Sequence, residues 1–299
     1  MSPRPPAAPP AHRPATGCAR VLGAALALAA CDPQDATTLD AGVGVDAPPD
    51  DAPPDAPPFV PVDPAWTDVG LGVAYRRMTT GDGVLIAYGG YTTQLTDSEA
   101  WATALVAARL ATAGIGHAYA VQGPADPGYT GLEIANTALR AHLAGAAPGA
   151  ASIYVIAHSS GAYVAHELLG QLARAGDAAT LARTGYANLD GDGAGFTAER
   201  AAALRALAFV YADDPTLAAG LSHNAAAMLA LGATYAPAGV AVEVTVPGSG
   251  CDDGASWCLH DLVITQRPHD PTSYDLARDY TDFVGRPVTT SYLDALGAP

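Results

Sequence analysis

A serine stands where a short apolar segment gives way to a helical pattern. Residues 153–157 are all apolar and are predicted to form a strand buried on both faces of a parallel sheet. From Ala162 onward, apolar residues recur at the spacing of a helix with one buried face. The turn between them reads Ala157-His158-Ser159-Ser160-Gly161. Small residues on both sides of Ser159 let strand and helix approach closely, which would expose its hydroxyl at a helix N-terminus as a nucleophile.

A serine hydroxyl needs a nearby imidazole that a carboxylate holds in the right tautomer. We predict that His260 is this base, because it follows the last predicted strand and lies beyond Ser159 and a candidate acid in the chain. His269, between two prolines, is the second choice, and His223 falls in a predicted helical stretch. His158 and His166 flank the serine and suit supporting roles.

The acid is expected at the end of a strand that follows the serine. Our choice is Asp190, which directly follows the predicted strand 185–189. Asp192 follows the same strand, and Asp213 and Asp214 follow the next, so all three stay open as alternatives.

Two backbone N–H groups must stabilise the oxyanion. Ser160 would supply the first. The second is expected from the turn after the strand that begins at Gly83, with Gly90 chosen over Gly89 and Tyr91.

Apolar strands alternate with amphipathic helices along the folded body. This order predicts an α/β fold with a mostly parallel sheet covered by helices on both faces. Capping boxes that begin at Thr96 and Thr130 predict two helix starts. The other predicted strands are 117–121, 207–211 and 240–246, and the other predicted helices are 162–175, 221–231 and a closing helix through Leu276, Tyr280 and Phe283.

The first 58 residues differ in composition from the rest. Arginines precede the apolar run 21–30, which is too short to span a bilayer but suits a secretory signal. Its ending, Leu28-Ala29-Ala30-Cys31, resembles a bacterial lipobox, so we expect residues 1–30 to be a signal peptide and Cys31 to be lipidated. The Asp/Ala/Pro-rich residues 31–58 are predicted to be a disordered linker, which leaves 59–299 as one catalytic domain. The protein would then be exported and anchored to a membrane, on the periplasmic or the cell-surface side.

Charge and cysteine usage fit this interpretation. The formal net charge is −16, and all 14 basic residues are arginine, which argues against a nucleic-acid partner. With Cys18 in the signal and Cys31 lipidated, Cys251 and Cys258 remain as an isolated pair that is typical of a disulfide in an exported protein. A metal site is the weaker reading, because only His260 lies nearby. We expect neither a metal nor an organic cofactor.

The strand–turn–helix segment resembles the nucleophile elbow of α/β-hydrolases, and the folded body resembles the pancreatic-lipase-type family of serine lipases. The matching segments are 85–90 with Trp101, 128–130 with Asn136, the elbow 154–162, Asn188-Leu189-Asp190 and Cys258-Leu259-His260. The resemblance implies an α/β-hydrolase fold in which Ser159, Asp190 and His260 form the catalytic triad. Three departures stand out: Ala157 replaces the first elbow glycine, Tyr88 replaces a histidine, and Gly90 replaces a bulky residue.

The sequence therefore predicts a serine hydrolase that cleaves small-molecule or lipid carboxylic esters through an acyl-enzyme. A lipase, an esterase and a phospholipase-like enzyme all fit. A peptidase or amidase with the same triad is one alternative. The other is an inactive, surface-anchored binding protein on a hydrolase scaffold.

Overall fold

The computed structural model describes residues 59–236, 239–251, 256–264 and 291–298. The predicted signal peptide, the lipidation site Cys31, the linker, His269 and the predicted closing helix lie outside these residues.

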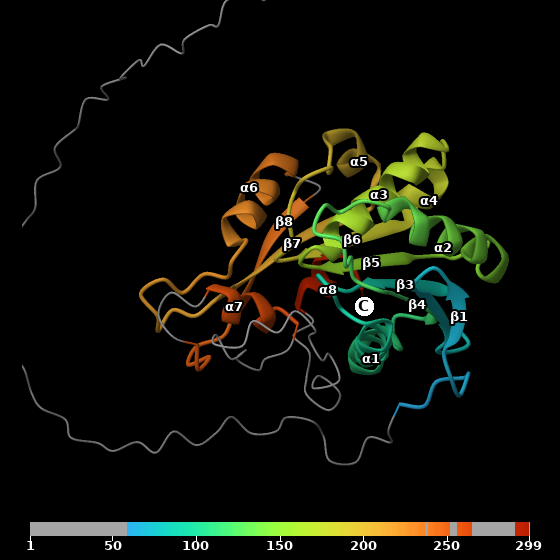
Figure 1. Ribbon diagram of the computed structural model, residues 1–299, viewed down its shortest axis with the longest axis horizontal. Coiled ribbons are helices and arrows are strands. Elements are labelled where there is room, and N and C mark those ends of the chain that lie inside the picture. The colour runs from blue at the N-terminus through green and yellow to red at the C-terminus, as the bar shows by residue number, and fades with distance from the viewer. Residues whose placement is uncertain (1–58, 237–238, 252–255, 265–290, 299) are drawn as a thin grey trace, which may run out of the picture. The chain divides into compact units, whose positions relative to one another are not determined.

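An eight-stranded sheet forms the centre of the described part (Figure 1). The strand order is β1-β2-β4-β3-β5-β6-β7-β8, in which β1 and β2 run antiparallel to their neighbours and all later pairings are parallel. This is the sheet of the α/β-hydrolase fold, so the predicted fold class is confirmed. The strands are β1 (Thr67–Gly70), β2 (Val73–Arg77), β3 (Gly83–Tyr88), β4 (Ile115–Val121), β5 (Ile153–His158), β6 (Thr184–Leu189), β7 (Ala206–Asp213) and β8 (Gly239–Thr245).

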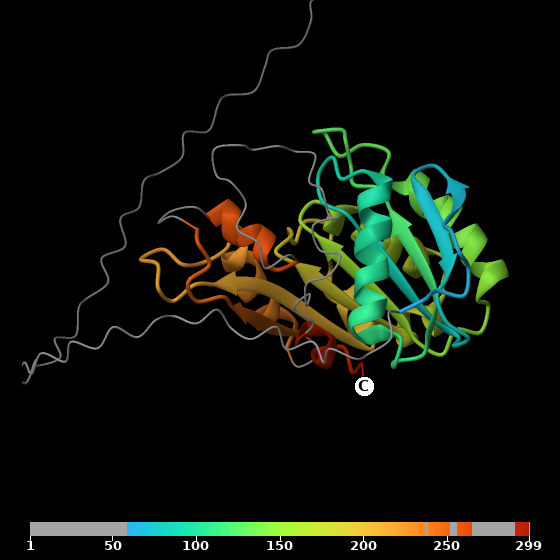
Figure 2. The ribbon, with the colours of Figure 1, turned by 90° about the horizontal axis from the view of Figure 1, so that it is seen from below.

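Helices cover both faces of the sheet and produce two separate cores. One core packs α1 (Leu95–Leu105), α7 (Ser256–Leu262) and α8 (Ser291–Ala295) against one face. The opposite core contains α2 (Leu132–Ala146), α3 (Gly161–Arg174), α4 (Ala178–Arg183), α5 (Ala198–Ala203) and α6 (Ala225–Tyr235). Figure 2 shows α1 lying across its side of the sheet. Strands β3 to β6 are buried along their whole length because helices lie on both sides, which explains the apolar sequences of β3 and β5.

Several predicted helix starts differ from the observed ones. Helix α1 is capped by Gln94 rather than Thr96, and the Asp97 carboxylate accepts the Gln94 N–H at 3.3 Å. Helix α2 begins after Gly131, which has φ +70°, because the predicted cap Thr130 gives its N–H and its hydroxyl to Asp126 instead. A π-helical turn (Val106–Leu110) continues α1.

None of the helices in the described ranges combines the length and the apolarity that a membrane span requires.

Candidate active site

Ser159 occupies the turn between β5 and α3 in a strained backbone conformation. Its φ is +53°, in the left-handed region that non-glycine residues rarely adopt. The close approach depends on Gly161, because a Cβ there would lie 2.5 Å from the Gly89 carbonyl oxygen and 2.6 Å from that of Tyr88. The Ser159 N–H donates to the Leu189 carbonyl at 3.0 Å, which ties the turn to the end of β6. The local geometry is therefore that of a nucleophile elbow.

Asp190 and His260 meet directly in the interior. The His260 Nδ1 atom lies 2.5 Å from the Asp190 Oδ2 atom, and both side chains are 1% exposed or less. Asp190 also has a positive φ, of +45°, immediately after β6. A histidine that donates Nδ1–H to a carboxylate presents Nε2 as the proton acceptor, which is the tautomer a general base needs.

The second carboxylate oxygen of Asp190 is held by the segment before α6. The Ser222 hydroxyl donates to Oδ1 at 2.7 Å, and the Asn224 N–H lies 3.2 Å from both carboxylate oxygens. The Asn224 side chain also donates to the Asp190 carbonyl at 2.7 Å. These donors fix the plane of the carboxylate so that Oδ2 faces His260. Sequence reasoning did not assign this role, although Ser222 and Asn224 before an alanine-rich helix are a helix-start signal.

Burial dominates the ionisation of Asp190. It raises the pKa of this carboxyl to about 6, against the hydrogen bonds from Ser222 and Asn224, which lower it. The group is therefore ionised at neutral pH and becomes protonated in mild acid.

The rival acids lie in other environments. Asp214 is buried, but its oxygens accept hydrogen bonds from Thr216 and Ser249, and these hold its pKa well below the usual range. Asp192 is exposed, and its Oδ1 accepts from the Ala194 N–H at 2.6 Å. Asp213 ends β7. Of the four candidates, Asp190 is the one that is hydrogen-bonded to the His260 imidazole in the described part of the chain.

His260 lies in a short helix, α7, and not in the loop that the sequence predicted. The Cys251–Cys258 disulfide is present, with the two Cα atoms 5.9 Å apart, and it fixes the helix two residues before His260. Trp257 meets the His260 ring edge-on at 5.1 Å and stacks on His223 at 3.5 Å. His223 thus lies before α6, in contact with α7, rather than inside a helix.

His158 supports His260 from the elbow. Its Nε2 atom lies 3.2 Å from the His260 carbonyl oxygen, and the two rings are 4.7 Å apart. Because His158 directly precedes Ser159, this contact and the bond from Ser159 to Leu189 bring the serine, the histidine and the aspartate to the same end of the sheet. His166 takes no part, because its imidazole bonds to the Tyr186 hydroxyl and the Ala194 carbonyl.

The predicted oxyanion donors are Ser160, in the elbow itself, and Gly90, in the turn after β3. Ser160 is the N-cap of α3, at the end of the helix where backbone N–H groups have no intrahelical acceptor. Gly90 follows β3 in a tight turn, in which its carbonyl accepts the Thr93 N–H at 3.1 Å. The contact of Gly161 with the carbonyls of β3 and Gly89 places this turn beside the start of α3.

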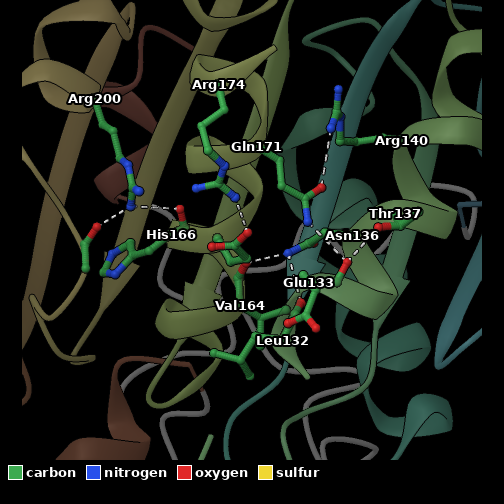
Figure 3. Close-up of polar contacts among 12 residues, drawn as sticks. Leu132, Glu133, Asn136, Thr137, Arg140, Val164, His166, Gln171, Arg174 and Arg200 are labelled. Atoms are coloured by element: carbon green, nitrogen blue, oxygen red, sulfur yellow. Dashed lines mark hydrogen bonds and ion pairs between the residues drawn. The ribbon is translucent and has the colours of Figure 1, made fainter. Parts of the chain in front are cut away.

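Tyr88, which stands where the resembled family has a histidine, serves packing. Its buried hydroxyl donates to the Asn136 Oδ1 at 2.8 Å. The Asn136 amide then donates to the carbonyls of Val164 at 2.7 Å and Leu132 at 3.3 Å (Figure 3). One buried amide thus joins the end of β3 to α2 and α3, next to the elbow.

The Cys251–Cys258 disulfide removes both thiols as metal ligands. Among the described residues, His158, His260 and Asp261 have ligand atoms within 4.8 Å of one another. All three are buried, and the His260 Nδ1 atom is already engaged by Asp190.

No protein-family model and no curated protein matches this chain. Among solved structures, a predicted CIB-like hydrolase from Thermoplasma acidophilum is 16% identical, covering 60% of this chain and 85% of its own, with a TM-score of 0.40. An α/β serine hydrolase homologue from Coxiella burnetii is 14% identical, covering 62% and 88%, with a TM-score of 0.40. An α/β serine hydrolase without a lid from Xanthomonas campestris is 14% identical, covering 63% and 87%, with a TM-score of 0.39. These identities and TM-scores are low. The α/β-hydrolase fold is therefore assigned from the strand order of this chain.

Proposed function

We propose that this protein is a serine hydrolase that cleaves carboxylic esters through an acyl-enzyme. The observation that carries the proposal is the buried hydrogen bond between His260 and Asp190, located at the end of the sheet where Ser159 sits in a strained elbow. Acyl transfer by a serine needs an imidazole that a carboxylate orients, and the His260–Asp190 pair supports the assignment of that base.

The reaction would proceed in two halves. Ser159 Oγ attacks the ester carbonyl while His260 Nε2 takes its proton, and Asp190 stabilises the imidazolium through Nδ1–H. The oxyanion accepts hydrogen bonds from the N–H groups of Ser160 and Gly90. Collapse of the tetrahedral intermediate transfers the proton from His260 to the leaving alcohol. Water, deprotonated by His260, then attacks the acyl-enzyme and releases the acid.

The direct test is fluorophosphonate labelling together with hydrolysis of p-nitrophenyl acetate. Wild-type protein should react with both reagents, and Ser159→Ala should react with neither while its circular dichroism spectrum stays unchanged. Ser249→Ala is the matched control and should retain both reactions. Labelling that persists in Ser159→Ala would refute the assignment of the nucleophile.

Two other functions differ from this one in measurable ways. A peptidase or amidase would hydrolyse an anilide faster than the matching ester. A binding protein on a hydrolase scaffold would ignore fluorophosphonate and retain its ligand after Ser159→Ala. The ester reading is preferred because ester cleavage is the less demanding acyl transfer for a Ser-His-Asp triad.

We also propose that the protein is exported and held at a membrane surface by lipid on Cys31. The lipobox-like sequence supports this proposal, as does the Cys251–Cys258 disulfide, since disulfides persist in oxidising compartments. In a bacterial host, Cys31→Ala should move the protein from the membrane to the soluble fraction. Equal membrane association of the variant and the wild type would contradict the anchor.

A further inference from the structure

Two exposed rings stack on each other beside the proposed base. The rings of His223 and Trp257 lie 3.5 Å apart with an angle of 19° between their planes. His223 is exposed, and Trp257 is 36% exposed. The contact joins the segment before α6 to the first turn of α7, which are distant in the sequence. We call this pair the His223–Trp257 stack.

The stack meets the His260 imidazole from the solvent side. Trp257 contacts that ring at 5.1 Å with an angle of 80° between the planes, and His223 lies at 6.3 Å with an angle of 87°. Both contacts have the edge-to-face geometry that aromatic rings favour at such separations. His260 itself is only 1% exposed. The two outer rings therefore cover the imidazole and restrict its tilt.

The His223 side of the stack is tied to the proposed acid. The residues on both sides of His223 bond to the Asp190 carboxylate. The Ser222 hydroxyl donates to Oδ1 at 2.7 Å, and the Asn224 N–H lies 3.2 Å from both oxygens. His223 is thus fixed to the segment that holds the acid, whereas Trp257 belongs to the helix that carries the base.

Helix α7 needs attachments of this kind because it is short. Its seven residues make about two turns, and a helix of that length gains little stability from its own hydrogen bonds. The Cys251–Cys258 disulfide attaches the helix to the chain that follows β8. The His223 ring attaches it to the segment around Asp190. The 2.5 Å separation of His260 Nδ1 and Asp190 Oδ2 therefore depends on both attachments.

We propose that Trp257 and His223 are positioning residues, whose stack holds the His260 imidazole against the Asp190 carboxylate and keeps water from the hydrogen bond between them. The inference rests on the proposed function, because both residues act through the proposed triad and are assigned no contact with the substrate. Loss of either ring would let the imidazole tilt, and a misplacement of about 1 Å can lower a rate about 10²-fold.

The first test is a double-mutant cycle in the hydrolysis of p-nitrophenyl acetate. Trp257→Ala and His223→Ala should each lower kcat about 10- to 100-fold and leave KM within about 2-fold, since the lost contact acts on the base and not on the substrate. Because the two rings act as one stack, the double variant should be no slower than the slower single variant. Trp257→Phe keeps an aromatic face and should recover most of kcat.

The second test observes the hydrogen bond itself by proton NMR. An imidazole Nδ1–H that donates to a carboxylate gives a signal far downfield, and rapid exchange with water broadens it. The signal should be sharp in the wild type, broadened in Trp257→Ala and restored in Trp257→Phe, and its loss in Asp190→Asn identifies it. Trp66→Ala removes a tryptophan directly before β1, at the end of the sheet opposite Ser159, and should keep both the signal and kcat.

The outcomes separate this inference from the function beneath it. An unchanged kcat and an unchanged signal in Trp257→Ala would overturn the inference, and so would additive losses in the double variant. Equal losses in Trp66→Ala would overturn it as well, because they would show a general effect of lost packing. If the wild type failed to react with fluorophosphonate, the proposed function would be wrong, and the NMR signal would still decide whether the stack holds His260 against Asp190.

Discussion

Replacement of Asp190 by asparagine changes one atom at the centre of the proposed site. In the wild type, Oδ1 accepts the Ser222 hydroxyl, Oδ2 faces His260, and the Asn224 N–H lies 3.2 Å from both oxygens. An asparagine would keep its oxygen toward those donors, which leaves its NH2 group facing His260 Nδ1. Nδ1 would then have to accept a hydrogen bond, and the proton would move to Nε2. An imidazole in this tautomer has no lone pair to offer Ser159.

The expected loss is large and confined to catalysis. Imposing the wrong tautomer on a serine triad lowers kcat about 10⁴-fold, which corresponds to about 5 kcal/mol in activation free energy. Stability at pH 7 should not fall. Burial raises the pKa of Asp190 from 3.8 to about 6, which means that the folded state favours the protonated carboxyl. Protonated Asp190 therefore stabilises the fold in acid, and this contribution is lost as the pH rises through 6. A neutral asparagine avoids this loss.

The assay is steady-state hydrolysis of p-nitrophenyl acetate, with thermal unfolding followed by circular dichroism. Asp213→Asn is the matched control on the neighbouring strand and should keep kcat within a few-fold of the wild type. If Asp190→Asn retained more than a tenth of wild-type kcat, or if Asp213→Asn suffered the larger loss, the assignment of the acid would be wrong.

Three further outcomes follow from the geometry of the site. Activity should decline as the pH falls below about 6, because protonated Asp190 no longer stabilises the imidazolium; a kcat/KM profile that stays flat to pH 4.5 would contradict this. Gly161→Ala places a Cβ 2.5 Å from the Gly89 carbonyl and should cost about 1–3 kcal/mol in unfolding free energy together with most of the activity, as urea titration and the ester assay would reveal. Replacement of Cys251 and Cys258 by serine removes a disulfide between residues seven positions apart and should lower the unfolding free energy by about 2–3 kcal/mol. An unchanged urea midpoint would show that the disulfide is dispensable for stability.

The elbow and the parallel sheet could be predicted because their sequence signals are local. The change from a continuous apolar strand to helical spacing takes place within five residues around Ser159, and Gly161 is required by a contact at that turn. The antiparallel strands β1 and β2 were missed because they are short and only partly buried, so they lack a continuous apolar run.

The supports of the site could not be predicted, because they join distant parts of the chain. Ser222 and Asn224 hold Asp190 from 32 and 34 residues away, and neither residue type identifies its acceptor. The cap of α2 was placed wrongly because Asp126, four residues earlier, competes for Thr130. His260 was expected in a loop, because a helix of seven residues is too short for its apolar periodicity to be recognised in the sequence.

The central claim is that Ser159, and not its neighbour Ser160, attacks the substrate. Peptide mass mapping after fluorophosphonate treatment tests it most directly, since the reagent leaves a stable phosphonyl group on the attacking oxygen. The account predicts one adduct per chain, on Ser159, and no adduct in His260→Ala. An adduct on Ser160 or on any other residue, or labelling that does not depend on His260, would contradict it.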